Sequence, residues 1–127
     1  MEPFLLVERD GPVVIATFNR PLERNTITET SQSEEIVAFC HEMTCDSSVK
    51  AIVLTGAGKA FCAGGNVKYM QERSGMFGGS PYAIRNSYRT SVQKIGPALT
   101  ELEVPIIAAI NGPAIGLGLD IACMCDI

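Results

Sequence analysis

Two short runs rich in apolar residues open the chain, and apolar residues at a helical spacing follow them. Residues 5–9 and 13–19 read as two strands, and Asp10-Gly11 between them is a dipeptide that favours a tight hairpin turn. The Thr26-Ile-Thr-Glu29 spacing matches a capping box, so a helix is expected to begin there. Its buried stripe is expected to consist of Ile36, Phe39, Cys40 and Met43.

Two further apolar runs end in glycine-rich turns. Residues 51–55 and 106–110 read as short buried strands, followed by turns that begin at Gly56 and at Asn111. Compact helices are expected at 67–72 and 116–123. Two strand–glycine–helix turns placed side by side can direct two backbone N–H groups at one point. Such a pair holds a negatively charged oxygen without using a side chain.

The segment between these turns is expected to contain a loop and a long helix. Residues 74–81 are rich in glycine and read as a mobile loop with Met76 and Phe77 exposed, able to close over a ligand. A helix is expected over 82–103, and its apolar face comprises Ile84, Tyr88, Val92, Ile95, Leu99 and Leu102. The alternation of strands and helices predicts an α/β fold with parallel neighbouring strands.

Composition narrows the class of protein. A chain of 127 residues suits one small domain, and 10 Lys and Arg against 14 Asp and Glu argue against a nucleic-acid binder. Five irregularly spaced cysteines argue against a disulfide framework and against a metal site. The N-terminus lacks a basic signal region, and prolines interrupt the longest uncharged run. We therefore expect a cytoplasmic protein with reduced thiols and no membrane span.

Three separated motifs occur in a fixed order: Arg20-Pro-x-x-x-Asn25, Lys59-Ala-Phe-Cys-Ala-Gly64, and Asn111-Gly-x-Ala-x-Gly116 shortly before Asp120. Together they resemble the crotonase family, the enoyl-CoA hydratase/isomerase superfamily. A Rossmann fingerprint and a P-loop both fail on spacing. The resemblance implies an α/β crotonase-like ββα spiral core, of which residues 1–127 would be the N-terminal part of an acyl-CoA-binding domain. Residues 124–127 read as the start of a further buried strand, so the chain is expected to be truncated before the helical region with which relatives form trimers or hexamers.

The resemblance also implies a site. The backbone amides of Gly65 and Leu117 would form an oxyanion hole for an enolate, and Asp120 would be a catalytic acid. No permanent cofactor is implied, since coenzyme A is part of the substrate. Residues implied to contact the CoA or acyl group are Arg24, Ala63, Gly64, Asn66, Val67, Lys68, Met70 and Phe77.

Two departures keep alternatives open. Many relatives have Asp where this chain has Asn66, and hydratases have Glu where it has Asp120, so both an enoyl-CoA hydratase and an enoyl- or dienoyl-CoA isomerase fit. A non-catalytic CoA-binding or scaffold relative also fits. In that case Asp120 would only favour its helix dipole, the glycines would only permit tight turns, and Arg24 and Lys68 would be ordinary surface charges. The family's second acid would lie beyond residue 127.

Overall fold

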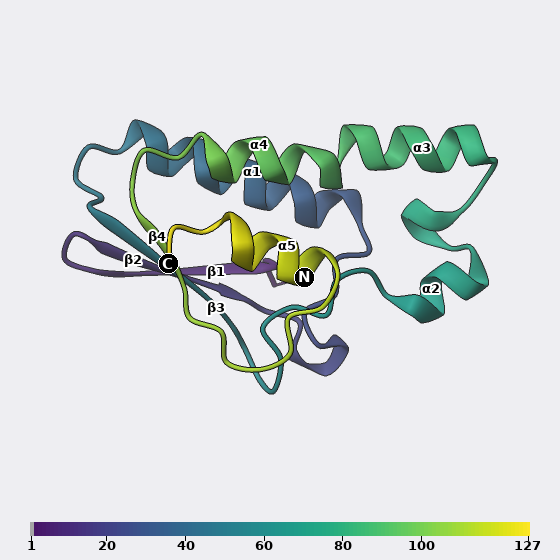
Figure 1. The fold of residues 1–127 in the computed structure, drawn as a ribbon, viewed down its shortest axis with the longest axis horizontal. Helices are drawn as coiled ribbons and strands as arrows, with labels where there is room; N and C mark the ends of the chain where they lie inside the picture. Colours follow the sequence, from purple (N-terminus) through teal and green to yellow (C-terminus); the bar gives the residue numbers. More distant parts are fainter. Residues whose placement is uncertain (1) are drawn as a thin grey trace.

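A computed structural model describes residues 2–127 as a mixed four-stranded sheet flanked by helices (Figure 1). The strands, in sheet order, are β1 (Leu5–Asp10), β2 (Val13–Phe18), β3 (Ala51–Gly56) and β4 (Ile106–Ala108). The β1–β2 pair is the expected antiparallel hairpin, with Gly11 at φ 60° in its turn. The β2–β3 and β3–β4 pairs are parallel, which confirms the expected α/β class.

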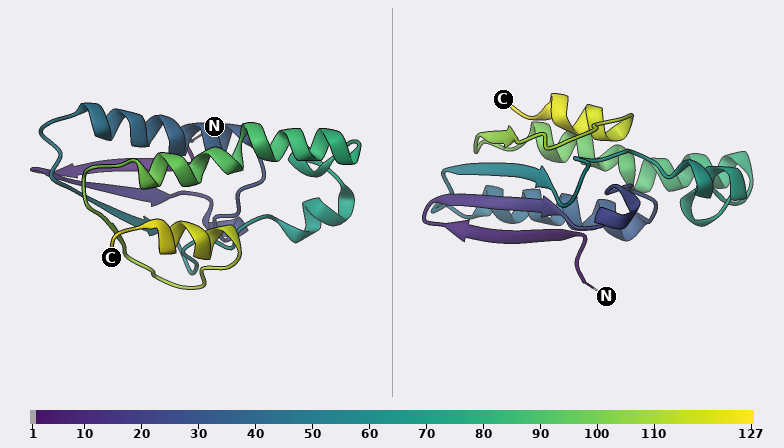
Figure 2. Two further views of the ribbon diagram at one scale, coloured as in Figure 1. Left: turned by 45° about the horizontal axis from the view of Figure 1, so that its top comes forward. Right: turned by 90° about the horizontal axis from the view of Figure 1, so that it is seen from below.

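Helices make both parallel crossovers. Helix α1 (Thr30–Cys45) joins β2 to β3, whereas α2 (Val67–Glu72), α3 (Pro81–Thr90) and α4 (Ile95–Thr100) lie between β3 and β4. Helix α5 (Leu117–Met124) follows β4, and Figure 2 shows it at the opposite end of the molecule from β1. Three short 3-10 segments complete the order: η1 (Pro21–Glu23), η2 (Gly75–Phe77) and η3 (Val92–Lys94).

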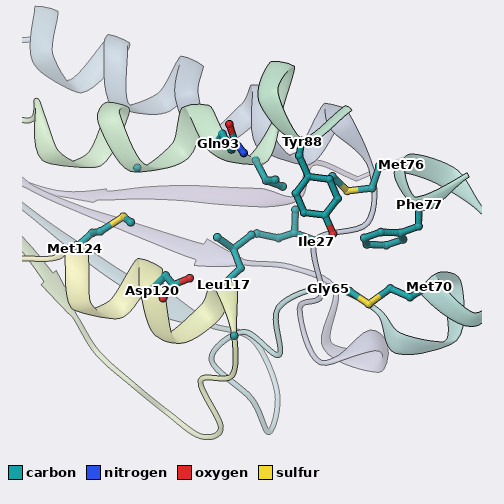
Figure 3. Close-up of a pocket in the computed structure, with 13 residues that line it drawn as sticks. Ile27, Gly65, Met70, Met76, Phe77, Tyr88, Gln93, Leu117, Asp120 and Met124 are labelled. Atoms are coloured by element: carbon teal, nitrogen blue, oxygen red, sulfur yellow. The ribbon is translucent and has the colours of Figure 1, made fainter. Parts of the chain in front are cut away.

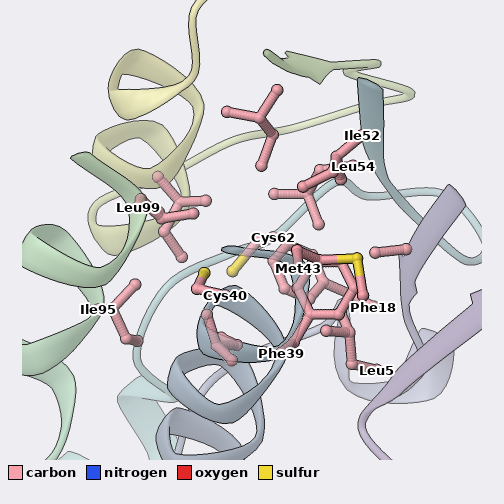
Figure 4. Close-up of a cluster of buried hydrophobic side chains, with 14 of the residues drawn as sticks. Leu5, Phe18, Phe39, Cys40, Met43, Ile52, Leu54, Cys62, Ile95 and Leu99 are labelled. Atoms are coloured by element: carbon pink, nitrogen blue, oxygen red, sulfur yellow. The ribbon is translucent and has the colours of Figure 1, made fainter. Parts of the chain in front are cut away.

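The core lies between the sheet and helices α1 and α4 (Figure 4). Alternate residues of the strands, such as Val14, Phe18 and Ile52, are buried because a strand presents every second side chain to one face. The expected α1 stripe is confirmed, and Ile95 and Leu99 of α4 are buried in the same cluster.

The start of α1 differs from the expectation. The helix begins at Thr30, not at Thr26, because Glu29 is extended and Ile27 N–H donates to the Gly64 carbonyl (2.8 Å). The capping role falls to Gln32, whose side-chain oxygen accepts from the Glu29 amide (2.9 Å). A tertiary backbone contact therefore overrides the local capping signal at Thr26.

The single helix expected over 82–103 is also wrong. Helix α3 ends at Thr90, and Ser91 leaves helical geometry with φ −130° and ψ −93°. The hydroxyl groups of Ser87, Thr90 and Ser91 each donate to the carbonyl four residues earlier. Such back-bonding bends helices, and here it coincides with the change to η3 and α4.

The end of the described chain lies beside β4. Strand β4 is shorter than the expected 106–110, but Asp126 N–H donates to the Ile106 carbonyl (2.9 Å) and Ala108 N–H to the Ile127 carbonyl (2.8 Å). Residues 126–127 thus take a place next to β4, where the next strand of the sheet was expected, without regular strand geometry. Across residues 2–127, no helix has the length and apolarity needed to cross a bilayer.

Candidate active site

The first glycine turn runs from the end of β3 at Gly56 to Gly65, and it lies between two other loops. On one side Ala63 N–H donates to the Arg24 carbonyl (3.0 Å), and Ile27 N–H donates to the Gly64 carbonyl. On the other side Ile115 N–H donates to the Cys62 carbonyl (3.0 Å). The three loops follow β2, β3 and β4, so the pairing joins them at the carboxyl ends of the parallel strands, where open α/β sheets place ligands.

Two asparagines fix the path of the chain from Gly56 to Phe61. The side-chain amide of Asn25, fully buried, donates to the carbonyls of Ala57 (3.0 Å), Ala60 (3.0 Å) and Phe61 (3.2 Å). Asn111 donates to the Gly58 carbonyl (3.1 Å) and also to that of Ala60 (3.2 Å). Both motif asparagines therefore brace the same turn, one from each flanking loop.

Glycines allow the second turn to approach the first. A Cβ on Gly118 would lie 1.9 Å from the Cys62 carbonyl oxygen, and one on Gly112 would lie 2.0 Å from that of Lys59. A Cβ on Gly64 would lie 3.2 Å from the Leu117 nitrogen. Only glycine fits at these backbone-to-backbone contacts, and they bring the residue before Gly65 against the start of α5.

The two amides singled out from the sequence are unpaired. Within residues 2–127, neither Gly65 N–H nor Leu117 N–H donates a hydrogen bond. Leu117 is the first residue of α5, so its amide has no partner in the helix and lies at the positive end of the helix dipole. Both residues line one cavity.

That cavity has a volume of about 470 Å³ and is mainly apolar (Figure 3). One wall comes from α5, the other from α3, η3 and α4, and the end nearest Gly65 is closed by α2 and η2. Tyr88, Gln93 and Asp120 are its polar side chains. Its remaining lining residues are Ile27, Gly65, Met70, Met76, Phe77, Val92, Gly96, Gly116, Leu117 and Met124.

The expected exposure of Met76 and Phe77 is wrong, because both side chains are buried. Residues 75–77 form η2, and the Phe77 ring packs edge to face on Tyr88 with a centroid distance of 6.1 Å. A Cβ on Gly65 would lie 2.4 Å from Met70 Cε and 3.3 Å from Phe77 Cζ. Met70 and Phe77 therefore cover Gly65, and Phe77 does so from a formed wall and not from an open loop.

Asp120 lies on the first turn of α5, three residues after Leu117, and lines the same cavity. Within residues 2–127 its carboxylate forms no hydrogen bond or ion pair, and its side chain is exposed. The carboxylate is therefore available to a ligand.

The residues implied to contact CoA lie along the edge of the first turn, outside the cavity lining. Arg24 and Ala63 are joined by their backbone, and Asn66 caps α2 by accepting from the Lys68 amide (3.0 Å). The side chains of Arg24, Val67 and Lys68 are exposed. Arg20 is occupied elsewhere, because its guanidinium donates to the carbonyls of Glu2 (2.8 Å), Pro3 (3.1 Å) and Asn19 (2.6 Å).

Several cavity residues were not singled out as site residues from the sequence. Tyr88 and Val92 were placed only on an apolar helix face, and Gln93, Gly96 and Met124 carry no motif. Their position depends on how α3 and α4 pack opposite α5. The signal that the sequence offered for these residues was the helical spacing of apolar positions between residues 88 and 96.

One of the five cysteines, Cys62, lies in the first turn and is buried. Burial raises the pKa of the Cys62 thiol to about 11, which keeps it protonated at neutral pH. No group of three or more His, Cys, Asp or Glu side chains in this part of the chain is placed to hold a metal ion.

Comparisons with known proteins agree on one family. The family model described as enoyl-CoA hydratase/isomerase matches residues 8–127. The short-chain-enoyl-CoA hydratase of Clostridium acetobutylicum is 36% identical over 124 residues. The solved structure of an enoyl-CoA hydratase from Mycobacterium smegmatis superimposes with a TM-score of 0.86 at 31% identity, and that of a monofunctional enoyl CoA isomerase from M. smegmatis with 0.74 at 28% identity.

These matches cover most of the chain but only part of each relative. The Clostridium match spans 97% of this chain and 44% of that protein. The hydratase structure match spans 99% of this chain and 47% of that chain, and the isomerase match 99% and 49%. The chain thus corresponds to the N-terminal portion of such proteins, about half their length or less.

Proposed function

Because the chain belongs to the enoyl-CoA hydratase/isomerase family, also called the crotonase family, we propose that its protein acts on enoyl-CoA thioesters as a hydratase or isomerase. The observation that carries the proposal is the pair of unpaired amides, Gly65 and Leu117, beside an apolar cavity that also holds the free Asp120 carboxylate.

The amides would stabilise the charge that develops on the thioester oxygen. Reaction at Cα or Cβ of an acyl thioester passes through an enolate, whose negative charge collects on that oxygen. Preorganised N–H donors in a water-poor pocket stabilise such charge by about 3 kcal/mol each. The Leu117 amide lies at the N-terminus of α5, where the helix dipole would further stabilise the negative charge.

Asp120 would transfer the proton. Isomerisation removes a proton from one carbon of the acyl group and returns it to another, which one carboxylate can do. Hydration adds water across the double bond and uses a second acid. Asp120 is the one acidic residue among 2–127 that lines the cavity, so these residues by themselves match the isomerase scheme more completely.

The CoA portion would follow the edge of the first turn. The backbone of Ala63, Gly65 and Val67 would meet the adenine and pantetheine arm, while the exposed Arg24 and Lys68 side chains would meet phosphate.

Asp120→Asn in the full-length protein tests this proposal. We expect turnover of crotonyl-CoA or a 3-enoyl-CoA to fall about 100-fold or more with CoA affinity nearly unchanged, because Asn keeps the size of the side chain but cannot exchange the proton. Asp120→Glu should shift the balance from isomerisation toward hydration if the reach of the acid decides the reaction.

The exposed Glu101, which does not line the cavity, provides the control Glu101→Gln, expected to keep full turnover. Unchanged turnover in Asp120→Asn would remove Asp120 from the mechanism and favour a non-catalytic CoA-binding relative. Failure of the wild-type protein to bind any acyl-CoA would reject both functions.

A further inference from the structure

One wall of the cavity carries polar groups that the proposed reaction does not use. Tyr88 of α3 and, farther along the same wall, Gln93 of η3 both line the cavity opposite α5. Figure 3 shows the Tyr88 hydroxyl pointing into the cavity, toward the end where Phe77 and Gly65 lie.

The Tyr88 ring is held in place. It packs on the buried Phe77 ring at an interplanar angle of 62°, the edge-to-face arrangement that aromatic pairs prefer. Its backbone carbonyl accepts from Ser91 N–H (3.3 Å) where α3 ends. The position of the hydroxyl is thus set by its surroundings before any ligand enters.

The Tyr88 hydroxyl forms no hydrogen bond within residues 2–127, whereas the Gln93 side chain is exposed to solvent. The Phe77 ring packs on Tyr88, and Ile27 and Met76 add apolar lining to the same cavity. A hydroxyl in apolar surroundings is costly to leave unpaired, and a half-buried tyrosine normally finds a partner for it. A plain hydrocarbon chain in this cavity would exclude water from the hydroxyl and supply no replacement.

At Gly96 the same wall lies close to the Met124 side chain. Gly96 contributes no side chain, and a Cβ there would lie 3.4 Å from Met124 Cε on the opposite wall, which is ordinary contact. The space between α4 and α5 at this point is therefore limited by the flexible Met124 side chain and not by backbone.

We propose that Tyr88 is a specificity-determining residue that selects acyl-CoA thioesters carrying a hydroxyl or carbonyl oxygen on the acyl chain, beyond the thioester group. The proposal rests on the function proposed above and names its substrate class. The phenol would donate to the acyl oxygen and so regain the hydrogen bond that it loses on desolvation.

The test is calorimetric binding of saturated thioesters to the full-length protein: hexanoyl-CoA and its 4-oxo, 5-oxo and 6-hydroxy derivatives. In the wild-type protein we expect the best oxygenated ligand to bind about 10-fold more tightly than hexanoyl-CoA, the scale of one neutral hydrogen bond. Tyr88→Phe, which keeps the ring on Phe77, should abolish this preference. Tyr82→Phe is the matched control, since Tyr82 lies on the same helix but is 69% exposed and outside the cavity lining.

The outcomes separate the two proposals. Equal affinity for hexanoyl-CoA and all oxygenated ligands in the wild-type protein, or a preference that survives in Tyr88→Phe, would overturn the role of Tyr88 while leaving acyl-CoA binding intact. The wild-type comparison needs no variant, so it does not depend on the folding of Tyr88→Phe. Absence of binding by every thioester would reject the proposed function and this inference together.

Discussion

Gly118→Ala is the most direct test of how the site is assembled. The added Cβ would lie 1.9 Å from the Cys62 carbonyl oxygen and 2.7 Å from its carbon, whereas ordinary contact begins at 3.4 Å. Helix α5 and the first turn must therefore separate by about 1.5 Å. Both sides of the contact are backbone, so no change of rotamer can relieve the overlap.

Two effects on stability oppose each other. Overpacking typically costs about 1–3 kcal/mol. Alanine is also the better helix former, by about 1 kcal/mol. We expect the free energy of unfolding to fall by about 1–2 kcal/mol. Leu117 directly precedes the substituted residue, so its amide should move relative to Gly65, and a misplacement of about 1 Å can reduce turnover about 100-fold.

The assay combines urea unfolding with turnover of crotonyl-CoA by the full-length protein. Gly96→Ala is the stability control, because its Cβ would meet only the end of the Met124 side chain at 3.4 Å and alanine favours helix α4. An unchanged free energy of unfolding in Gly118→Ala would refute the close approach of the two turns. A loss of stability with full turnover would refute only the role of the Leu117 amide.

Two further predictions concern buried polar groups. Asn25→Ala should lower the free energy of unfolding by about 3 kcal/mol, since it removes the side-chain bonds to three carbonyls and leaves alanine at φ 56°; a loss below 1 kcal/mol in urea unfolding would contradict this. Burial raises the pKa of Cys62 from 9.0 to about 11, so its contribution to stability should be present below pH 9 and decline as the pH rises through 11. Iodoacetamide at pH 8, followed by peptide mass mapping, should modify the exposed Cys45 long before Cys62, and equal rates would refute the burial.

The sequence predicted the elements whose signals are local. The β1–β2 hairpin, the α1 stripe and the limits of α2 all follow from periodicity and turn residues, and the structure has them where expected. The start of α1 could not be predicted, because Ile27 is drawn into a backbone contact with Gly64 that is distant in the chain. The break at Ser91 depends on hydroxyl back-bonding that competes with an otherwise continuous apolar face.

The residues of the candidate site also divide into those that sequence motifs mark and those that only tertiary packing brings to the cavity. Gly65, Leu117 and Asp120 were found because motifs mark them, and the structure brings them to one cavity, although their roles stay predictions. Tyr88 and Met124 carry no motif, and they reach the cavity only through the packing of α3 and α4 opposite α5. Met76 was misplaced because a glycine-rich segment usually indicates an exposed loop, whereas here η2 folds its side chain inward.

The three loops of the site are joined mainly by main-chain hydrogen bonds, and this has an evolutionary consequence. Bonds such as Ala63 to Arg24 and Ile115 to Cys62 are indifferent to the side chains at those positions. Mutation can therefore alter which groups surround the two amides while the amides keep their places, provided that Gly112 and Gly118 remain glycine and Asn25 keeps its contacts. Such a scaffold can drift to about 30% identity and acquire new substrates by exchanging the lining of its cavity, without rebuilding the part that would stabilise the enolate.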